Sequence, residues 1–318
     1  MCTALTLDAP KHLFGRNLDL AASFGQLAIC LPKDAPIQFA RKEAASHYAM
    51  LGIGAKLGNL PLFAEAINSE GLAMAGLNFP GNAYFKKPEG RSNEVGQGEL
   101  IAYVLSFCKD LTEAKALLSS ISLCDIRVEP NTPCAPLHYI LADRTGCFVF
   151  EQTIEGTHIY DDPFGILTNN PEFPFMSRYM DMFLNLTAES PKNRFSPRLG
   201  LKSFGLGMGA IGLPGDNSGP SRFVRASFAR ENSSFASEAE EIVGFFHILD
   251  NVKVVEGTAN EGDSKEKTVY SSCYDLESFC LYCKTYGDPT IRKMEGKENG
   301  EEMISSPLSD KPDFPSLI

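Results

Sequence analysis

Apolar residues along the chain fall mainly into short runs separated by Gly, Pro, Asn and Asp, a pattern typical of β-strands. The run GLAMAGL over residues 71–77 consists of small apolar residues, as expected of a strand with both faces covered. The last two runs are close enough in sequence to form a hairpin. The pattern predicts strands over residues 2–7, 13–17, 26–31, 48–55, 71–77, 137–142, 147–153, 157–160, 268–275 and 278–286.

Helical signals occur in fewer segments, and they predict helices over residues 99–108, 113–118, 175–186 and 237–249. Ser237 begins the last of these and glutamates follow in its first turn, which suits an N-cap and the helix dipole. No repeat or linker divides the chain, so we expect one α+β domain over residues 2–294. Residues 295–318 are charged, contain proline and lack periodicity, so we expect a poorly ordered tail.

The composition is typical of a globular protein with a sizeable core. Apolar residues make up 43% of the 318 residues and charged residues 22%. The net charge of −11, without any run of Lys or Arg, argues against nucleic-acid binding. No apolar stretch approaches the roughly 18 residues of a membrane span. The N-terminus also lacks the pattern of a secretory signal, so we expect a cytoplasmic protein without membrane insertion.

Two motifs that suggest a metal or a cofactor have better structural explanations. Cys280 and Cys283 form a single C-x-x-C on a predicted strand, where residues three apart face opposite sides and no second pair completes a zinc site. Residues 207–212 match G-x-G-x-x-G, but Leu213 and Pro214 follow and stop the helix that nucleotide binding needs. The nine cysteines are odd in number and are expected to be reduced thiols. We therefore expect no metal and no cofactor.

Cys2 is the first residue with candidate chemistry. A small residue after Met1 favours removal of the methionine, which leaves Cys2 with a free α-amine. An α-amine ordinarily has a pKa of about 7.7–8.0, so one residue then carries both a thiol nucleophile and a base. Taken alone, Cys2 is better explained as an accident of the translation start.

Polar residues interrupt apolar or turn-rich strings at four further places. Arg16 and Asp19 lie in FGRNLD, close to the first strand, where they form either a surface salt bridge or a charged environment for Cys2. On a straight strand they face opposite sides, so their convergence requires a turn near Asn17. Asn78 and Asn169 each end a strand, as turn residues or as hydrogen-bond donors to an oxyanion.

The fourth place is the segment from Gly215 to Arg225. It contains SRFVR, in which one arginine faces inward and the other solvent, and the sequence does not say which.

Together the strings FGRNLD, AGLNFPG, LTNNP, GLPGD and SRFVR, in this order, resemble the choloylglycine hydrolase family, also called conjugated bile acid hydrolases, within the N-terminal nucleophile hydrolases. The resemblance runs from Met1 to about residue 291. It implies a four-layer αββα sandwich, in which two mainly antiparallel sheets pack face to face with helices on their outer faces. It also implies a homotetramer.

The resemblance further implies the role of each site residue. Cys2 is the nucleophile after methionine removal, with Arg16 and Asp19 beside it. Asn78 and Asn169 lie at the oxyanion, and Arg222 joins the polar network. In chemical terms, the thiol attacks an amide carbonyl, the α-amine transfers the proton to the leaving amine, and water releases the acid from the thioester. Each oxyanion donor contributes roughly 3–4 kcal/mol.

The substrate class follows from the same resemblance. The position of Asn78 is typically Asn in bile salt hydrolases and often Tyr in penicillin V acylases, which favours glycine- and taurine-conjugated bile acids. Apolar loops over residues 18–24, 57–63 and 126–137 either line a groove for a steroid or pack in the core; Leu18, Leu57 and Leu137 are the candidate substrate contacts. Because the substrate is an anion, Arg16 and Arg222 must offset the net charge of −11 locally.

Three alternatives remain open. The chain is a penicillin V acylase or another N-acyl amide hydrolase, a steroid-binding protein without turnover, or an enzyme that passes the acyl group to an amino acid. None of the five histidines is needed for the mechanism. His138 and His247 lie in apolar strings, which is typical of core histidines with satisfied hydrogen bonds.

Overall fold

The structure is a computed structural model that describes residues 1–8, 10–41, 43–44, 46–128 and 133–312. Two large sheets form its centre. The first has six strands in the order β14 (Ile166–Leu167), β1 (Cys2–Asp8), β2 (His12–Leu20), β17 (Lys267–Asp275), β18 (Cys280–Thr285) and β19 (Arg292–Glu295). The second has eight strands in the order β13 (Gly156–Asp161), β12 (Gly146–Thr153), β11 (Leu137–Asp143), β8 (Ala73–Asn78), β7 (Leu60–Asn68), β6 (Met50–Leu57), β3 (Leu27–Leu31) and β20 (Ile304–Pro307).

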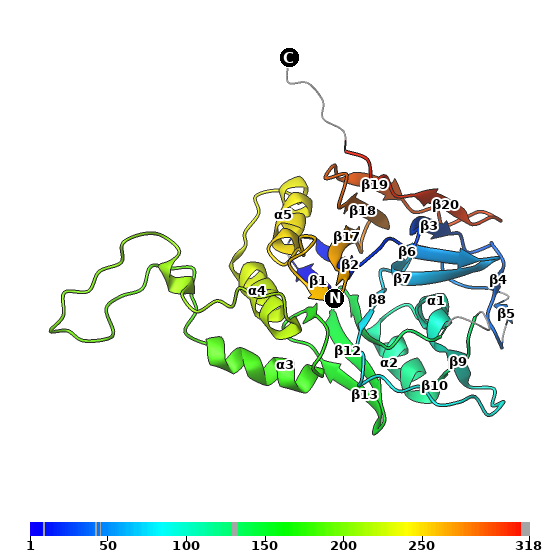
Figure 1. Ribbon diagram of the computed structural model, residues 1–318. Helices are drawn as coiled ribbons and strands as arrows, with labels where there is room; N and C mark the ends of the chain where they lie inside the picture. Colours follow the sequence, from blue (N-terminus) through cyan, green and yellow to red (C-terminus); the bar gives the residue numbers. More distant parts are fainter. Residues whose placement is uncertain (9, 42, 45, 129–132, 313–318) are drawn as a thin grey trace, which may run out of the picture.

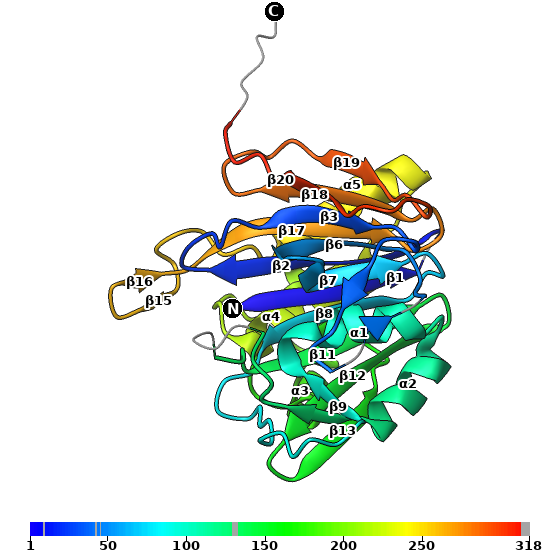
Figure 2. The same cartoon turned by 90° about the vertical axis from the view of Figure 1, so that its right-hand side faces the viewer.

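Helices cover the outer faces of the two sheets. Figures 1 and 2 show α4 and α5 on one side of the paired sheets and α1 and α2 on the other. The expected four-layer αββα sandwich of mainly antiparallel sheets is therefore confirmed. The helices are α1 (Leu100–Phe107), α2 (Leu111–Ser120), α3 (Phe173–Met180), α4 (Gly219–Asn232) and α5 (Glu238–Asp250), with short 3-10 turns at Gln97–Glu99, Asp181–Phe183 and Met208–Ala210.

Three pairs of short strands complete the described elements. They are β9 (Glu94–Gly96) with β10 (Ser122–Cys124), β4 (Ile37–Gln38) with β5 (Glu43–Ala44), and β15 (Asn260–Glu261) with β16 (Ser264–Lys265).

The position of β8 between two cores explains why its sequence consists of small apolar residues. Ala73, Ala75 and Leu77 belong to the core between the two sheets. Leu72, just before the strand, and Met74 belong to the second core, beneath α1 and α2. Successive side chains point to opposite faces, so both faces of β8 are buried, as the sequence predicts.

The C-terminal segment differs from the prediction. Residues 295–318 were expected to form a poorly ordered tail, but β19 crosses the predicted boundary and β20 pairs antiparallel with β3, Ile304 opposite Cys30. β20 satisfies backbone groups that β3 would otherwise leave free at the edge of the sheet. The prediction is therefore wrong for residues 304–307, and residues 313–318 lie outside the described residues.

Helix α4 is an element that the sequence pattern did not predict. Ser218 caps it by accepting a hydrogen bond from Ser221 N. Both arginines of SRFVR, Arg222 and Arg225, are buried, so the expectation that one faces solvent is wrong. Charged residues on the buried face break the apolar spacing by which a helix is normally predicted.

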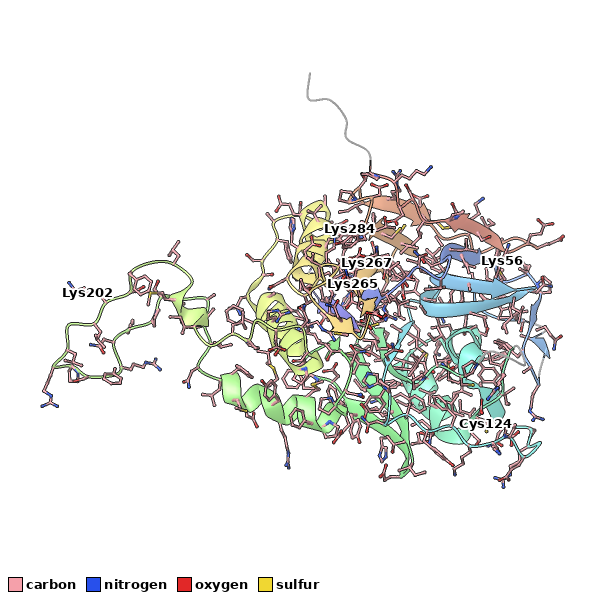
Figure 3. All side chains as sticks on the ribbon, in the orientation of Figure 1. Lys56, Cys124, Lys202, Lys265, Lys267 and Lys284 are labelled. Carbon is pink, nitrogen blue, oxygen red and sulfur yellow. The ribbon has the colours of Figure 1, made fainter. Side chains whose placement is uncertain are left out.

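A long loop over residues 184–217, between α3 and α4, projects from the body (Figure 1). Lys202, which is labelled in Figure 3, lies on the outer part of this loop. Large apolar side chains on this loop are exposed: Phe195, Phe204, Leu206 and Ile211.

Candidate active site

Cys2 is the first residue of β1 and follows directly after the chain end that is marked N in Figure 1. It is buried, with 3% of its surface exposed, and pairs with Leu18 of β2. Its backbone nitrogen donates a hydrogen bond to Asn169 Oδ1 over 2.7 Å. Met1 precedes it, and the Met1 ammonium group donates to the Asp19 carbonyl over 3.0 Å and contacts the Glu266 carboxylate.

The side chain of Asn169 connects β1, α4 and β8 through hydrogen bonds to Cys2, Arg222 and Asn78. It follows β14, which pairs with β1 through Ala4 and Leu167. Asn169 Oδ1 accepts from Cys2 N and also from Arg222 Nη2 over 2.6 Å. Its Nδ2 donates to the Asn78 carbonyl over 2.8 Å. Two strand ends far apart in the sequence thus meet at the cysteine.

The backbone N–H and carbonyl of Asn78 lie on the side of β8 away from β11. Phe79 N donates to Pro136 O over 2.7 Å, and hydrogen bonds alternate along an antiparallel ladder. The Asn78 backbone groups therefore face away from β11, and the Asn78 carbonyl on that side accepts from Asn169.

Arg222 extends from α4 onto the first residues of β1. Its guanidinium donates to Thr3 Oγ1 over 2.6 Å and to the Cys2 carbonyl, and its Nε donates to Asn217 O over 2.9 Å. Burial lowers the pKa of Arg222, against the opposing effect of Asp19. Arg225, by contrast, holds the preceding loop through Pro214 O and Asp216 O.

Arg16 and Asp19 lie on opposite faces of an unbroken strand, so the turn expected near Asn17 is absent from this described segment and that prediction is wrong. Arg16 points between the sheets, where its Nη1 donates to Gly76 O over 2.6 Å. Asp19 lies on the face toward the helices and accepts from Thr268 Oγ1 over 2.6 Å. The nine residues of β2 stay extended because β1 and β17 pair with it on both sides.

Both groups keep unused hydrogen-bonding capacity. Asp19 Oδ2, Arg16 Nε and Arg16 Nη2 are buried without a hydrogen-bond partner. Burial raises the pKa of Asp19, against Arg222 and the Thr268 hydrogen bond. Burial also disfavours the charged form of Arg16, but electrostatic interactions with Cys2 and Glu65 raise the pKa of Arg16 overall.

This arrangement is suited to attack on a carbonyl group. The Cys2 thiol interacts electrostatically with two buried guanidinium groups, and the amide side chain of Asn169 connects the Cys2 backbone to Asn78. These are the parts that a covalent acyl-transfer site needs: a nucleophile, cationic groups and oxyanion donors.

The match to a family model decides the assignment. Residues 2–305 match the family of linear amide C–N hydrolases called the choloylglycine hydrolase family. This chain belongs to that family. It is therefore an enzyme of the linear amide C–N hydrolase class, and the resemblance inferred from the sequence is confirmed.

Individual relatives cover nearly the whole chain. The bile salt hydrolase/transferase of Lactiplantibacillus plantarum is 37% identical over 320 residues, 99% of each chain. The C2A mutant of the conjugated bile acid hydrolase from Clostridium perfringens is similar in structure, with a TM-score of 0.91, 31% identity and 100% of both chains covered. Penicillin V acylase from Agrobacterium tumefaciens shares the fold, with a TM-score of 0.75, 17% identity and 96% and 90% of the two chains covered.

Glu65 is a residue at this choloylglycine hydrolase site that the sequence analysis missed. It is fully buried on β7, its Oε2 lies 3.6 Å from Arg16 Nη1, and the same oxygen accepts from Tyr270 Oη over 2.9 Å. Burial raises the pKa of Glu65 to about 7, against the effect of Arg16. The available signal was a lone glutamate inside the apolar run LPLFAEAIN.

The candidate substrate contacts differ in position. Leu18 lies opposite Cys2 and Leu137 lies opposite Asn78, so both adjoin the site. Leu18 belongs to β2 rather than to a loop. Leu57 pairs with Leu60 at the β6–β7 hairpin, and its described contacts do not connect it to Cys2. Part of the predicted segment 126–137, residues 129–132, lies outside the described residues.

Among the described residues, no group of three or more His, Cys, Asp and Glu side chains is arranged to hold a metal ion. Within the same part of the chain, no helix has the length and apolar character needed to cross a bilayer.

Proposed function

We propose that this enzyme hydrolyses the amide bond of glycine- and taurine-conjugated bile acids through a thioester at Cys2. The observation that carries the proposal is the convergence of Cys2, Asn169 and Arg222, held by hydrogen bonds of 2.7 Å and 2.6 Å around Asn169 Oδ1. Relatives of similar length are named bile salt hydrolase/transferase, which supports this substrate class.

In the proposed reaction, removal of Met1 frees the α-amine of Cys2. The thiol sulfur attacks the amide carbonyl, and its proton passes to the amine, directly or through water. The negative oxygen of the tetrahedral intermediate accepts hydrogen bonds from Asn169 Nδ2 and the Asn78 backbone N–H. The intermediate collapses as the amine returns the proton to the leaving glycine or taurine. Water then attacks the thioester, the bile acid leaves, and the thiol is restored.

The remaining polar residues support this chemistry electrostatically. Arg16 favours the thiolate, and its unpartnered Nε and Nη2 are available to an anion. Asp19, with its unpartnered Oδ2, orients the freed ammonium group. Arg222 orients Asn169 and the first residues of β1 through their oxygens.

Asn78 supports bile acid conjugates over penicillin V, because penicillin V acylases often have Tyr at this position. Leu18 and Leu137 flank Cys2 and Asn78 and supply apolar surface for a steroid, with Leu57 as the third candidate contact. The shared fold with a penicillin V acylase at 17% identity does not separate the two activities.

A parallel assay tests the substrate class. We expect the purified enzyme to release amino acid from taurocholate and glycocholate faster than it cleaves penicillin V. A rate dominated by penicillin V would reverse the assignment. Binding of bile salts without turnover by the wild type would identify a steroid-binding protein instead.

Acyl transfer is a second candidate activity, because relatives are named hydrolase/transferase. The same thioester accepts an amino acid in place of water. Product analysis with added glycine or phenylalanine separates the two outcomes.

We also propose that the enzyme is a homotetramer in the cytoplasm. The projecting loop over residues 184–217 supports self-association, because Phe204 and Leu206 are 90% and 97% exposed. Large apolar side chains that project from a folded body are suited to contact with another copy.

A further inference from the structure

His138 contacts residues that are next in sequence to both proposed oxyanion donors. It is fully buried on β11, where it pairs with Leu77 of β8. Its Nε2 is 3.0 Å from the carbonyl oxygen of Thr168, and its Nδ1 is 3.1 Å from Glu151 Oε1. Its ring stacks on the ring of Phe79, with a centroid separation of 4.2 Å and an interplanar angle of 6°.

The two neighbours of this ring are adjacent in sequence to the two proposed oxyanion donors. Thr168 immediately precedes Asn169, and Phe79 immediately follows Asn78. One imidazole therefore contacts both strand ends whose amide groups meet at Cys2. The two donors are attached to different strands, but the same ring contacts a neighbour of each. A shift of the ring would therefore move both donors together.

Both partners of the ring nitrogens are acceptors. A carbonyl oxygen only accepts, and Glu151 Oε1 already accepts from Phe173 N over 3.0 Å. The ring is thus held at both nitrogens, by Thr168 on one side and Glu151 on the other, while its face packs on Phe79.

We propose that His138, held between Thr168 O and Glu151 Oε1, is a positioning residue that aligns the Asn78 N–H and Asn169 Nδ2 for the oxyanion. This inference rests on the proposed function, because it assigns His138 to the same acyl-transfer step. It replaces the sequence-based interpretation of His138 as an inert core residue.

The substitution His138→Gln tests the proposal. Glutamine retains a donor for Thr168 but loses the contact with Glu151 and the stack on Phe79. We expect kcat for taurocholate to fall by about tenfold to a hundredfold with KM changed little, because a small misplacement of donors acts mainly on the transition state. Alkylation of Cys2 by iodoacetamide develops no oxyanion, so its rate should stay within about twofold of the wild-type rate.

His47 supplies a matched control. It is also buried, and its two ring nitrogens lie 2.7 Å and 2.8 Å from the carbonyl oxygens of Tyr48 and Ala35. His47→Gln removes a comparable bridge elsewhere in the fold. We expect it to leave kcat for taurocholate unchanged even if it lowers the thermal midpoint.

In the single variant, Glu151 loses its His138 partner and is left buried, which can impair folding. The double substitution His138→Gln with Glu151→Gln removes this carboxyl and serves as a second variant that avoids the problem. A low kcat with normal Cys2 alkylation in either variant supports the proposal. An unchanged kcat, or a parallel loss of kcat and alkylation in both variants, overturns it. Failure of the proposed function is distinct, because the wild type itself would then not cleave taurocholate or glycocholate.

Discussion

Arg16 and Glu65, both fully buried, face each other across the space between the two sheets, with Nη1 and Oε2 3.6 Å apart. Arg16 belongs to the six-stranded sheet and Glu65 to the eight-stranded sheet. Tyr270 adds a hydrogen bond to the same carboxylate. The guanidinium of Arg16, which is proposed to favour the Cys2 thiolate, thus interacts with the Glu65 carboxyl of the opposite sheet.

The pH dependence of stability follows from Glu65. Burial raises its pKa from about 4.5 to about 7 in the folded state, so folding favours the protonated carboxyl. Its contribution to stability is complete below about pH 4.5 and is lost as the pH rises to about 7. We expect the unfolding free energy of the wild type, relative to Glu65→Gln, to decrease over this window in urea titrations. A difference that does not vary with pH would contradict this.

The nucleophile is tested by Cys2→Ser. The fold should be unchanged because the two side chains are close in size, while kcat for taurocholate falls by roughly a thousandfold or more. Circular dichroism and the conjugate assay measure the two properties. Substantial activity in this variant would exclude the thioester mechanism.

Processing of the N-terminus gives an independent test. We expect active enzyme to begin at Cys2 by mass spectrometry, because an amide nitrogen cannot act as the base. A variant that retains Met1 should be folded and inactive. Full activity with Met1 present would rule out the α-amine as the proton carrier.

Asn169→Ala removes a proposed oxyanion donor. We expect kcat to fall by about a hundredfold to a thousandfold. The neighbouring Asn170 is half-buried and is a suitable control, since its Nδ2 donates to Pro80 O over 2.8 Å in a solvent-exposed hydrogen bond. Asn170→Ala should retain most of the activity, and equal losses in the two variants would argue against a specific role of Asn169.

Strand β20 is expected to protect an edge of the eight-stranded sheet. Deleting residues 304–318 exposes β3 and should lower the thermal midpoint and promote aggregation, measured by light scattering. Deleting only residues 313–318 is the control and should have little effect. Equal behaviour of both truncations would mean that β20 contributes nothing to stability.

The projecting loop tests the proposed assembly. The double substitution Phe204→Ser with Leu206→Ser removes two exposed apolar side chains. We expect a smaller particle than the wild type by light scattering coupled to size-exclusion chromatography. An unchanged tetramer would show that these side chains do not hold it, and a monomeric wild type would refute the tetramer itself.

Much of the fold was predictable because its signals are local. The small apolar run of β8 identified a strand covered on both faces, and Ser237 with its glutamates marked the start of α5. Helix α4 was missed because Arg222 and Arg225 occupy its buried face, and β20 was missed because four residues with a proline carry almost no periodic signal.

The sequence by itself determined the family, through five short strings in order, and the candidate residues Cys2, Asn78 and Asn169. Only the tertiary structure decided which face Arg16 and Asp19 occupy, and that Arg222 reaches Cys2 across 220 positions of the chain. It alone brought Glu65 to Arg16 and His138 to the oxyanion strands. The physical reason is that periodicity and turn chemistry act between neighbours in sequence, whereas a buried charge is defined by partners that only the packed sheets and helices bring together.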